Sequence, residues 1–451
     1  MVSRDHPVTI VEFAHALRSG ATTAERQTAA CLSQIAVLNG TLNAFITVTG
    51  DAALAQARAA DQELKTGRDR GPLHGVPISV KDLIDVAGLP TTAASRVRDG
   101  HRAEADATVT TRLRDAGAVF VGKTNLHEFA LGTTNEDSAY GPAHHPLDHE
   151  RSPGGSSGGS AIAVATGMSL ASIGTDTGGS IRIPSAMCGL VGLKPASGDV
   201  PAGGVVPLST TLDHVGPMAR SVADARIVYH ALRGEAAAPA ANVRVRRVGV
   251  PRDYFLALLD SQVASAFDRA GDRLRGAGVE VVDVAIPHAA DLATVYADIV
   301  LSEAAAYHAE SLTTMAEAYT PNVRTRIEKG RSISGEAYVR ALQGRERLRA
   351  EVDAALRGCD ALILPTVAVP ATRLGAETVR VADRDEPIRM VTLRLTQLFN
   401  VTGHPAITLP CGTTDEGLPI GLQLAGHAGA TVALLDVAEA IERYGVSGES
   451  R

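Results

Sequence analysis

The chain lacks the features of a secreted, membrane-bound or nucleic-acid-binding protein. It has only four cysteines in 451 residues, far apart at Cys31, Cys188, Cys359 and Cys411, whereas a disulfide framework or a metal ribbon needs paired spacings. The net charge is −7 and no block of basic residues occurs, which argues against nucleic acid and anionic membranes as partners. We therefore expect a cytoplasmic protein with neither kind of partner.

Long apolar segments are also missing. The longest uncharged run, residues 152–175, is about half glycine, serine and threonine, so we interpret it as buried protein interior and not as a bilayer span. The first residues, Met1–His6, carry charges and have no apolar centre, so we expect no signal peptide. With 45% hydrophobic residues, the chain can bury one large core or two ordinary domains.

Helical patterns alternate with short apolar runs along the chain. This alternation predicts an α/β protein with a covered, largely buried sheet. The capping-box pattern Thr22–Glu25 starts the first of these helices, and Asn39–Gly40 is expected to end it. Helices are expected over 22–40, 108–116, 261–276 and 431–443, and strands over 76–80, 118–121, 279–284, 361–364, 406–409 and 420–424.

One compositional break, Gly234–Asn242, could be a domain linker. We interpret it as a surface loop, because strands of the same kind resume directly after it. The prediction is a single domain over residues 1–451, with N-terminal helices in 1–60 and a core in 61–220. Residues 300–390 are rich in charge and are expected to form a helical cap that selects the substrate.

The glycine- and serine-rich run Ser152–Ser160 is the first candidate for a functional loop. Such runs are also common as plain linkers, but this one leads into the apolar stretch Ala161–Gly167. Within it, Gly154–Gly158 matches the nucleophile-elbow pattern of α/β-hydrolases, which requires a strand directly before the turn. The preceding residues, 144–152, have a loop-like composition, so the run is interpreted as a different kind of functional loop.

A second candidate is Thr175–Ser180, with the sequence Thr-Asp-Thr-Gly-Gly-Ser. Consecutive glycines allow several backbone N–H groups to point at one place, which is what an oxyanion requires. A serine at the end of such a nest could attack a carbonyl. The alternative is a tight structural turn.

Lys81 is the third candidate, because it follows the apolar run Val76–Val80. A buried lysine either pairs with a carboxylate or loses its proton. Asp82 and Asp85 are close in sequence, so a salt bridge is the alternative to a catalytic base.

Three other patterns are rejected. Gly117–Thr124 has the spacing of a phosphate-binding loop, but its inner residues form the expected strand themselves. His127–Glu128 lacks a second helical histidine, because position 131 is leucine. His144, His145 and His149 are interpreted as part of an exposed polar loop, so no metal site is expected.

Lys81, Ser156 and Ser180, in their surrounding motifs, resemble the amidase signature family of serine hydrolases. The resemblance spans nearly the whole chain and is weakest between Gly234 and Cys359. Further matching stretches are Leu42–Phe45, Gly71–Asp82, Gly122–Glu128, Cys188–Pro195, Leu212–Pro217, Gly403–Ala406 and Gly417–Gln423.

The resemblance implies a role for each residue. Ser180 would be the nucleophile, Ser156 a proton relay after a cis peptide bond from Gly155, and Lys81 the base. The backbone N–H groups of Thr177, Gly178, Gly179 and Ser180 would form the oxyanion hole. Ala130, together with Ser156, would contact the substrate. The implied fold is a mixed β-sheet core flanked by helices on both faces.

The implied reaction is hydrolysis of a carboxylic amide, or else of an anilide or a carbamate, through an acyl-enzyme on Ser180. No metal or organic cofactor is implied, the expected partner is a small-molecule substrate, and a homodimer is possible. The alternative is the glutaminase subunit of a tRNA-dependent amidotransferase. Thr320–Gly330 keeps an arginine-containing segment of those subunits but lacks the aromatic, glycine-rich stretch that precedes it there. The sequence therefore favours a stand-alone amidase.

Overall fold

A computed structural model describes residues 9–446, so the charged stretch Met1–His6 lies outside the described residues. One eleven-stranded sheet runs through them in the order β1-β3-β2-β4-β6-β5-β12-β13-β9-β7-β8, and β10 and β11 pair separately. The strands are β1 (Phe45–Val48), β2 (Pro77–Lys81), β3 (Val119–Thr124), β4 (Ala171–Asp176), β5 (Val191–Lys194), β6 (His214–Ala219), β7 (Arg247–Pro251), β8 (Glu280–Val284), β9 (Ala361–Pro365), β10 (Thr378–Val381), β11 (Arg384–Pro387), β12 (Ala406–Thr413) and β13 (Pro419–Ala425).

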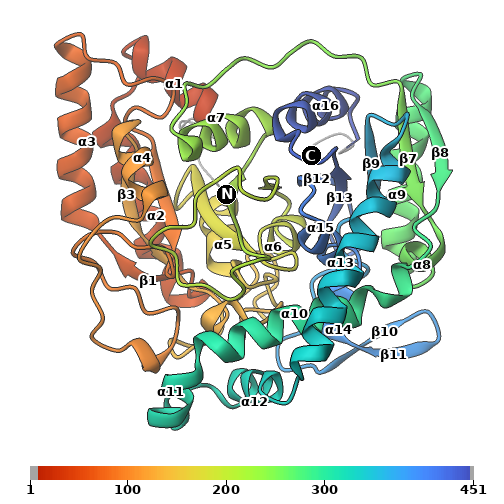
Figure 1. The fold of residues 1–451 in the computed structure, drawn as a ribbon. Helices are drawn as coiled ribbons and strands as arrows, with labels where there is room; N and C mark the ends of the chain where they lie inside the picture. Colours follow the sequence, from red (N-terminus) through yellow and green to blue (C-terminus); the bar gives the residue numbers. More distant parts are fainter. Residues whose placement is uncertain (1–8, 447–451) are drawn as a thin grey trace.

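Helices connect most of the strands along the chain (Figure 1). They are α1 (Ile10–Arg18), α2 (Ala24–Leu42), α3 (Gly50–Lys65), α4 (Thr108–Asp115), α5 (Gly158–Ala165), α6 (Arg182–Met187), α7 (Val222–Arg233), α8 (Asp253–Leu256), α9 (Ser261–Gly276), α10 (Leu292–Tyr307), α11 (Ala309–Thr314), α12 (Pro321–Gly330), α13 (Gly335–Leu356), α14 (Ile388–Leu393), α15 (Gln397–Thr402) and α16 (Thr431–Arg443). Short 3₁₀ turns are η1 (Arg96–Arg98), η2 (Glu128–Ala130), η3 (Ala289–Asp291) and η4 (Ala316–Ala318).

The sheet is mixed. Strand β2 pairs in parallel with β3 and β4, whereas β4 pairs antiparallel with β6. At the other end, β7 is parallel to both β8 and β9. Because β2 and β4 are parallel neighbours, Lys81 and Asp176 end their strands at the same edge of the sheet.

Helices cover both faces of the sheet, as strand β9 illustrates. Ala361 and Ile363 pack into one apolar cluster with α7, α9 and α16, whereas Leu362 and Leu364 pack into the cluster that contains α10 and α13. Successive side chains of a strand point to opposite faces, so both faces are buried. The predicted α/β class, a mixed sheet between helices, is confirmed.

Most predicted elements are present with small shifts in their ends. Helices α9 and α16 have the expected bounds, and the predicted strand at 118–121 extends to Thr124 as β3. The expected capping box at Thr22 is wrong. Helix α2 is capped by the Thr23 side chain, which accepts from the backbone N–H of Arg26, and the helix continues past Asn39–Gly40 to Leu42.

The region expected to be a helical cap, residues 300–390, is only partly helical. Helices α10 to α13 account for its first part, and in Figure 1 α11 and α12 lie at the lower edge of the view with α10 above them. Helix α13 ends at Leu356, and the apolar run Ala361–Pro365 then enters the sheet between β13 and β7. The β10–β11 hairpin follows.

The stretch at 234–242 contains no helix or strand and connects α7 to β7, consistent with a surface loop. Figure 1 shows it crossing the top of the view. Among the helices within residues 9–446, none combines the length and apolar character needed to cross a bilayer.

Candidate active site

Lys81 is the last residue of β2 and is fully buried. Its Nζ lies 2.7 Å from Ser156 Oγ and 2.9 Å from Thr175 Oγ1. Both neighbours are hydroxyl groups, which can accept from an ammonium group or donate to a neutral amine. The lysine therefore has partners in either protonation state.

Burial lowers the pKa of Lys81 to about 7, although the charges of Asp213 and Asp176 raise it. The neighbours in sequence do not supply a counter-charge. Asp82 instead pairs with Lys123, with 3.0 Å between Asp82 Oδ1 and Lys123 Nζ. The salt-bridge alternative for Lys81 therefore fails, because the adjacent carboxylate is engaged on another residue.

Ser156 lies in the loop before α5 and is fully buried. The peptide bond from Gly155 to Ser156 is cis, as the resemblance predicts. Gly155 leaves no room for a side chain, because a Cβ there would lie 2.8 Å from the backbone nitrogen of Asn135. The backbone N–H of His127 donates to the Ser156 carbonyl at 3.0 Å. The loop is therefore held from two sides.

Ser180 lies between the end of β4 and the start of α6, and 5% of its surface is exposed. Gly178 and Gly179 beside it are buried. Within residues 9–446, no group accepts a hydrogen bond from the backbone N–H of Gly178, Gly179 or Ser180. Buried N–H groups without partners are rare in proteins, and three in succession suit a site that binds a negatively charged oxygen.

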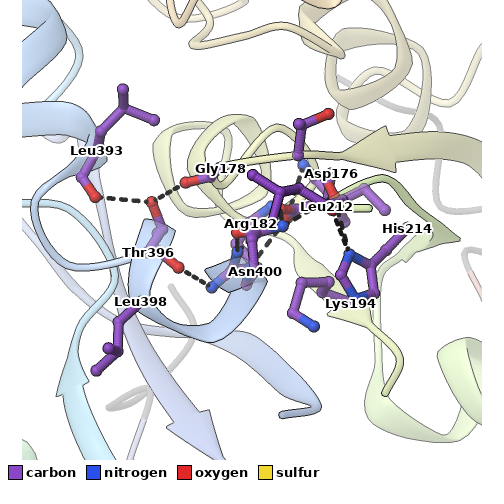
Figure 2. Close-up of polar contacts among 12 residues, drawn as sticks. Asp176, Gly178, Arg182, Lys194, Leu212, His214, Leu393, Thr396, Leu398 and Asn400 are labelled. Carbon is purple, nitrogen blue, oxygen red and sulfur yellow. Dashed lines mark hydrogen bonds and ion pairs between the residues drawn. The ribbon is translucent and has the colours of Figure 1, made fainter. Parts of the chain in front are cut away.

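A buried ion pair fixes the loop at both ends (Figure 2). The Arg182 guanidinium contacts the Asp176 carboxylate at 2.9 Å and 3.0 Å, and Asn400 Nδ2 donates to the same carboxylate at 2.8 Å. Burial alone would raise the pKa of Asp176, but the charge and hydrogen bonds of Arg182 lower it below its usual value. Because Asp176 precedes the loop and Arg182 follows it, the pair sets the loop's span.

Thr396 fixes the middle of the loop. Its hydroxyl donates to the Gly178 carbonyl at 2.6 Å (Figure 2). That carbonyl shares a rigid peptide plane with the N–H of Gly179, so the bond also orients this N–H. Gly179 has φ +143°, and a Cβ on it would lie 2.3 Å from Thr396 Oγ1. Only glycine fits at this position.

Asp213, just before β6, is the charged residue on the other side of the loop. The Thr177 hydroxyl donates to Asp213 Oδ1 at 2.5 Å, and the backbone N–H groups of Leu208 and Ser209 donate to its other oxygen. Burial raises the pKa of Asp213 to about 6 despite these bonds. It is one of the two carboxylates that act on Lys81.

The structure therefore brings Lys81 and Ser156 into contact and places the Thr177–Ser180 loop beside them. The Ser157 backbone N–H donates to the Ser180 carbonyl at 3.3 Å, which joins the two serine loops. Ala130 is buried in the η2 turn, close in sequence to His127, which contacts Ser156. Its contact with a substrate stays a prediction.

Sequence reasoning missed several residues of this site. Thr175 and Asp213 lie inside quoted motifs but carry no local signal of their role. Thr396 and Asn400 come from a region in which no site was expected, and only the chain's three-dimensional course brings them to the loop.

The histidines at 144, 145 and 149 do not converge on a common point. His144 Nδ1 contacts the His149 carbonyl at 2.7 Å, and His145 Nε2 contacts the Met187 carbonyl at 2.8 Å. The expectation of an exposed loop is wrong for His145, which is fully buried.

A buried lysine in contact with one serine, near a second serine on a loop of N–H groups without partners in residues 9–446, is an arrangement that suits a serine hydrolase. The sequence profile of the family described as Amidase matches residues 26–435. The chain belongs to this amidase family, whose members hydrolyse C–N amide bonds.

Relatives of two kinds are similar over nearly the whole chain. A glutamyl-tRNA(Gln) amidotransferase subunit from Chloroflexus aurantiacus (strain ATCC 29366 / DSM 635 / J-10-fl) is 39% identical, covering 97% of this chain and 96% of its own. A crystal structure described as an amidase has a TM-score of 0.92 at 39% identity, covering 96% of this chain and 99% of its own. The peptide amidase of Stenotrophomonas maltophilia has a TM-score of 0.83 at 32% identity, with 96% coverage of both chains.

Proposed function

We propose that this chain hydrolyses a carboxylic amide through an acyl-enzyme on Ser180. Neutral Lys81 takes a proton from Ser156, which takes one from Ser180 as Ser180 attacks the amide carbonyl. The oxyanion then binds the free N–H groups of the Thr177–Ser180 loop. The same relay returns a proton to the departing amine, because an unprotonated amine leaves poorly. Water finally hydrolyses the acyl-enzyme.

The observation that carries the proposal is the environment of Lys81. A lysine with an ordinary pKa near 10.4 is neutral in about one molecule in a thousand at pH 7.4. With its pKa at about 7, roughly half of the molecules hold a neutral amine near pH 7. That amine lies 2.7 Å from Ser156 Oγ, which is hydrogen-bonding distance for proton transfer.

Two settings for this chemistry are supported by different comparisons. The curated relatives favour a glutaminase component that works within an amidotransferase, which reverses the order of preference drawn from the sequence. The high TM-score with a crystal structure described as an amidase supports a stand-alone hydrolase. Both settings use the same acyl-enzyme. Carbamates remain a further class of substrate that the same attack could cleave.

The two settings can be separated with the purified chain. It would be assayed alone against amides, anilides, carbamates and glutamine, and then with added amidotransferase partner subunits. A stand-alone enzyme releases amine without a partner and without ATP. Activity that appears only with glutamine and only with the partners identifies the glutaminase component. If the Ser180→Ala variant hydrolyses the same substrates at the native rate, the proposed mechanism is refuted in both settings.

A further inference from the structure

A cavity of about 360 Å³ lies next to the Thr177–Ser180 loop, between α10, α12 and α14. Tyr296 and Leu393 form the wall that it shares with the loop. A Cβ on Gly178 would lie 2.4 Å from Tyr296 Oη and 3.0 Å from Leu393 Cδ2, so both side chains pack directly on Gly178. Cavities of this size hold small molecules, and this one adjoins the loop proposed to bind the oxyanion.

The charged residues that line the cavity are all cationic. They are Arg326, Lys329, Arg389 and Arg394, and no aspartate or glutamate lies among the lining residues. Two of them have identifiable partners. Arg394 stacks on the Tyr254 ring, with its Cζ 3.8 Å from the ring centre, and Asp298 interacts electrostatically with the exposed Lys329.

Arg326 and Arg389 remain without an anionic partner. The Arg326 guanidinium donates to the Leu131 carbonyl at 2.8 Å, and within residues 9–446 neither arginine forms an ion pair. The carboxylate whose charge raises the pKa of Arg326 is that of Asp137, which is engaged by His127, with 3.1 Å between His127 Nε2 and Asp137 Oδ2. Burial, and then the charge of Arg389, lower the pKa of Arg326 to about 10. The two guanidinium groups therefore repel each other in a partly buried place.

Arg326 and Arg389, two neighbouring arginines without an anionic partner in the described part of the chain, can bind a carboxylate. A planar guanidinium binds a carboxylate through two parallel hydrogen bonds, and an anion between two guanidinium groups relieves their repulsion. We propose that the cavity holds the free carboxylate of the substrate between Arg326 and Arg389, so that the substrate is an amide carrying a carboxylate and no ammonium group. This inference rests on the proposed amide hydrolysis at Ser180.

The cationic side chains that line the cavity also disfavour a substrate that carries an ammonium group. An α-ammonium group entering this cavity would meet four cationic side chains and no carboxylate, and like charges in a partly buried site repel strongly. Glutaramate and glutamine form a matched pair for this test. They have the same chain length, carboxylate and amide, and differ only in the α-ammonium group of glutamine.

The first experiment compares kcat/KM for glutaramate, glutamine and the uncharged butyramide. A hydrogen bond to a charged group contributes about 1.5–3 kcal/mol. We therefore expect kcat/KM for glutaramate to be roughly 10- to 100-fold higher than kcat/KM for butyramide. We also expect kcat/KM for glutaramate to be at least about tenfold higher than kcat/KM for glutamine. Equal rates for glutaramate and butyramide, or a preference for glutamine, would overturn the inference.

Variants then assign the preference to the two arginines. Arg389→Gln and Arg326→Gln should each lower kcat/KM for glutaramate roughly 10- to 100-fold and leave that for butyramide within about twofold. Arg324→Gln is the matched control, because Arg324 is also on α12 but pairs with Glu317 and Glu328. This variant should leave kcat/KM unchanged for both glutaramate and butyramide. An equal loss on both substrates would show a structural role and contradict the assignment.

Binding to the Ser180→Ala variant, measured by calorimetry, separates this inference from the proposed function. If the variant binds glutaramate more tightly than glutamine but the native chain turns over no amide, the proposed function fails and the cavity inference holds. If the native chain hydrolyses butyramide through Ser180 and the carboxylate gives no advantage in binding or rate, the cavity inference fails and the proposed function holds.

Discussion

Asp82 follows Lys81 directly in the sequence, yet its carboxylate pairs with Lys123, at 3.0 Å between Oδ1 and Nζ. Successive side chains of a strand point to opposite faces of the sheet. The Asp82 carboxylate therefore points away from Lys81, although the two residues are adjacent in sequence, and forms its ion pair with Lys123. Lys81 is left with the hydroxyl groups of Ser156 and Thr175. This separation allows the pKa of Lys81 to fall to about 7.

The first prediction concerns Lys81 as a base. For the native enzyme, kcat/KM should rise with pH through one ionisation near pH 7 and then reach a plateau, because only the neutral amine accepts a proton. Lys81→Ala should lose roughly 10²- to 10⁴-fold and lack this ionisation. Lys81→Arg should not restore activity, since guanidinium stays charged. A near-native rate with an unchanged pH profile in Lys81→Ala would place the base elsewhere.

The second prediction is that Lys81 costs stability. Its folded pKa of about 7 is below its unfolded value, so between those values the unfolded chain binds more protons and the free energy of unfolding rises with pH. Lys81→Met should therefore be more stable than the native chain by roughly 1–3 kcal/mol at pH 7, and the difference should shrink towards pH 10. Denaturant unfolding at several pH values measures it.

Lys123→Met is the matched control for that experiment. Both lysines are fully buried, but removing Lys123 leaves Asp82 as an unpaired buried carboxylate. This variant should lose roughly 3–5 kcal/mol. The account would be contradicted if the two variants changed stability in the same direction.

The third prediction concerns Asp213, whose charge raises the pKa of Lys81. Asp213→Asn removes that charge and keeps a carbonyl that can accept from Thr177, so the midpoint of the kcat/KM profile should move to a lower pH. Asp85→Asn is the comparison, because Asp85 acts on Lys123 and its removal should leave the midpoint in place. A midpoint that moves to a higher pH in Asp213→Asn would contradict the statement that the charge of Asp213 raises the pKa of Lys81.

The fourth prediction tests Thr396 as a positioning residue. Thr396→Val has the same shape but removes the donor to the Gly178 carbonyl, so the Gly179 N–H is less firmly oriented. We expect kcat to fall roughly tenfold or more with little change in KM, because the interaction with the oxyanion exists only in the transition state. Thr396→Ser keeps the hydroxyl and should retain most of kcat. A change in KM alone would indicate a role in substrate binding.

The sequence predicted the parts of the site that local pattern controls. The glycines at 178 and 179 and the lysine after an apolar strand are local features, and the structure places them where the motif reasoning expected. The element ends were less accurate. Asn39–Gly40 did not end α2, which continues to Leu42 and ends where Asn43 adopts φ +49°, because favourable tertiary packing outweighs a weak local stop signal.

The supports of the site could not be predicted from local pattern. Thr396 and Asn400 are more than two hundred residues from Gly178 and Asp176 in sequence, and their contacts depend on how the sheet order brings the C-terminal segment beside β4. The cavity could not be predicted from local pattern either, because Tyr296, Arg326 and Arg389 lie on three separate helices, α10, α12 and α14. Only the folded chain places these residues together.

The most direct test of the account is the site of covalent labelling by a phosphonofluoridate or sulfonyl fluoride probe. The account predicts that peptide mapping by mass spectrometry finds the label on Ser180, and that Ser180→Ala abolishes it while Ser157→Ala, the matched neighbouring variant, keeps it. A label on Ser157, or labelling that persists unchanged in Ser180→Ala, would contradict the assignment of Ser180 as the nucleophile.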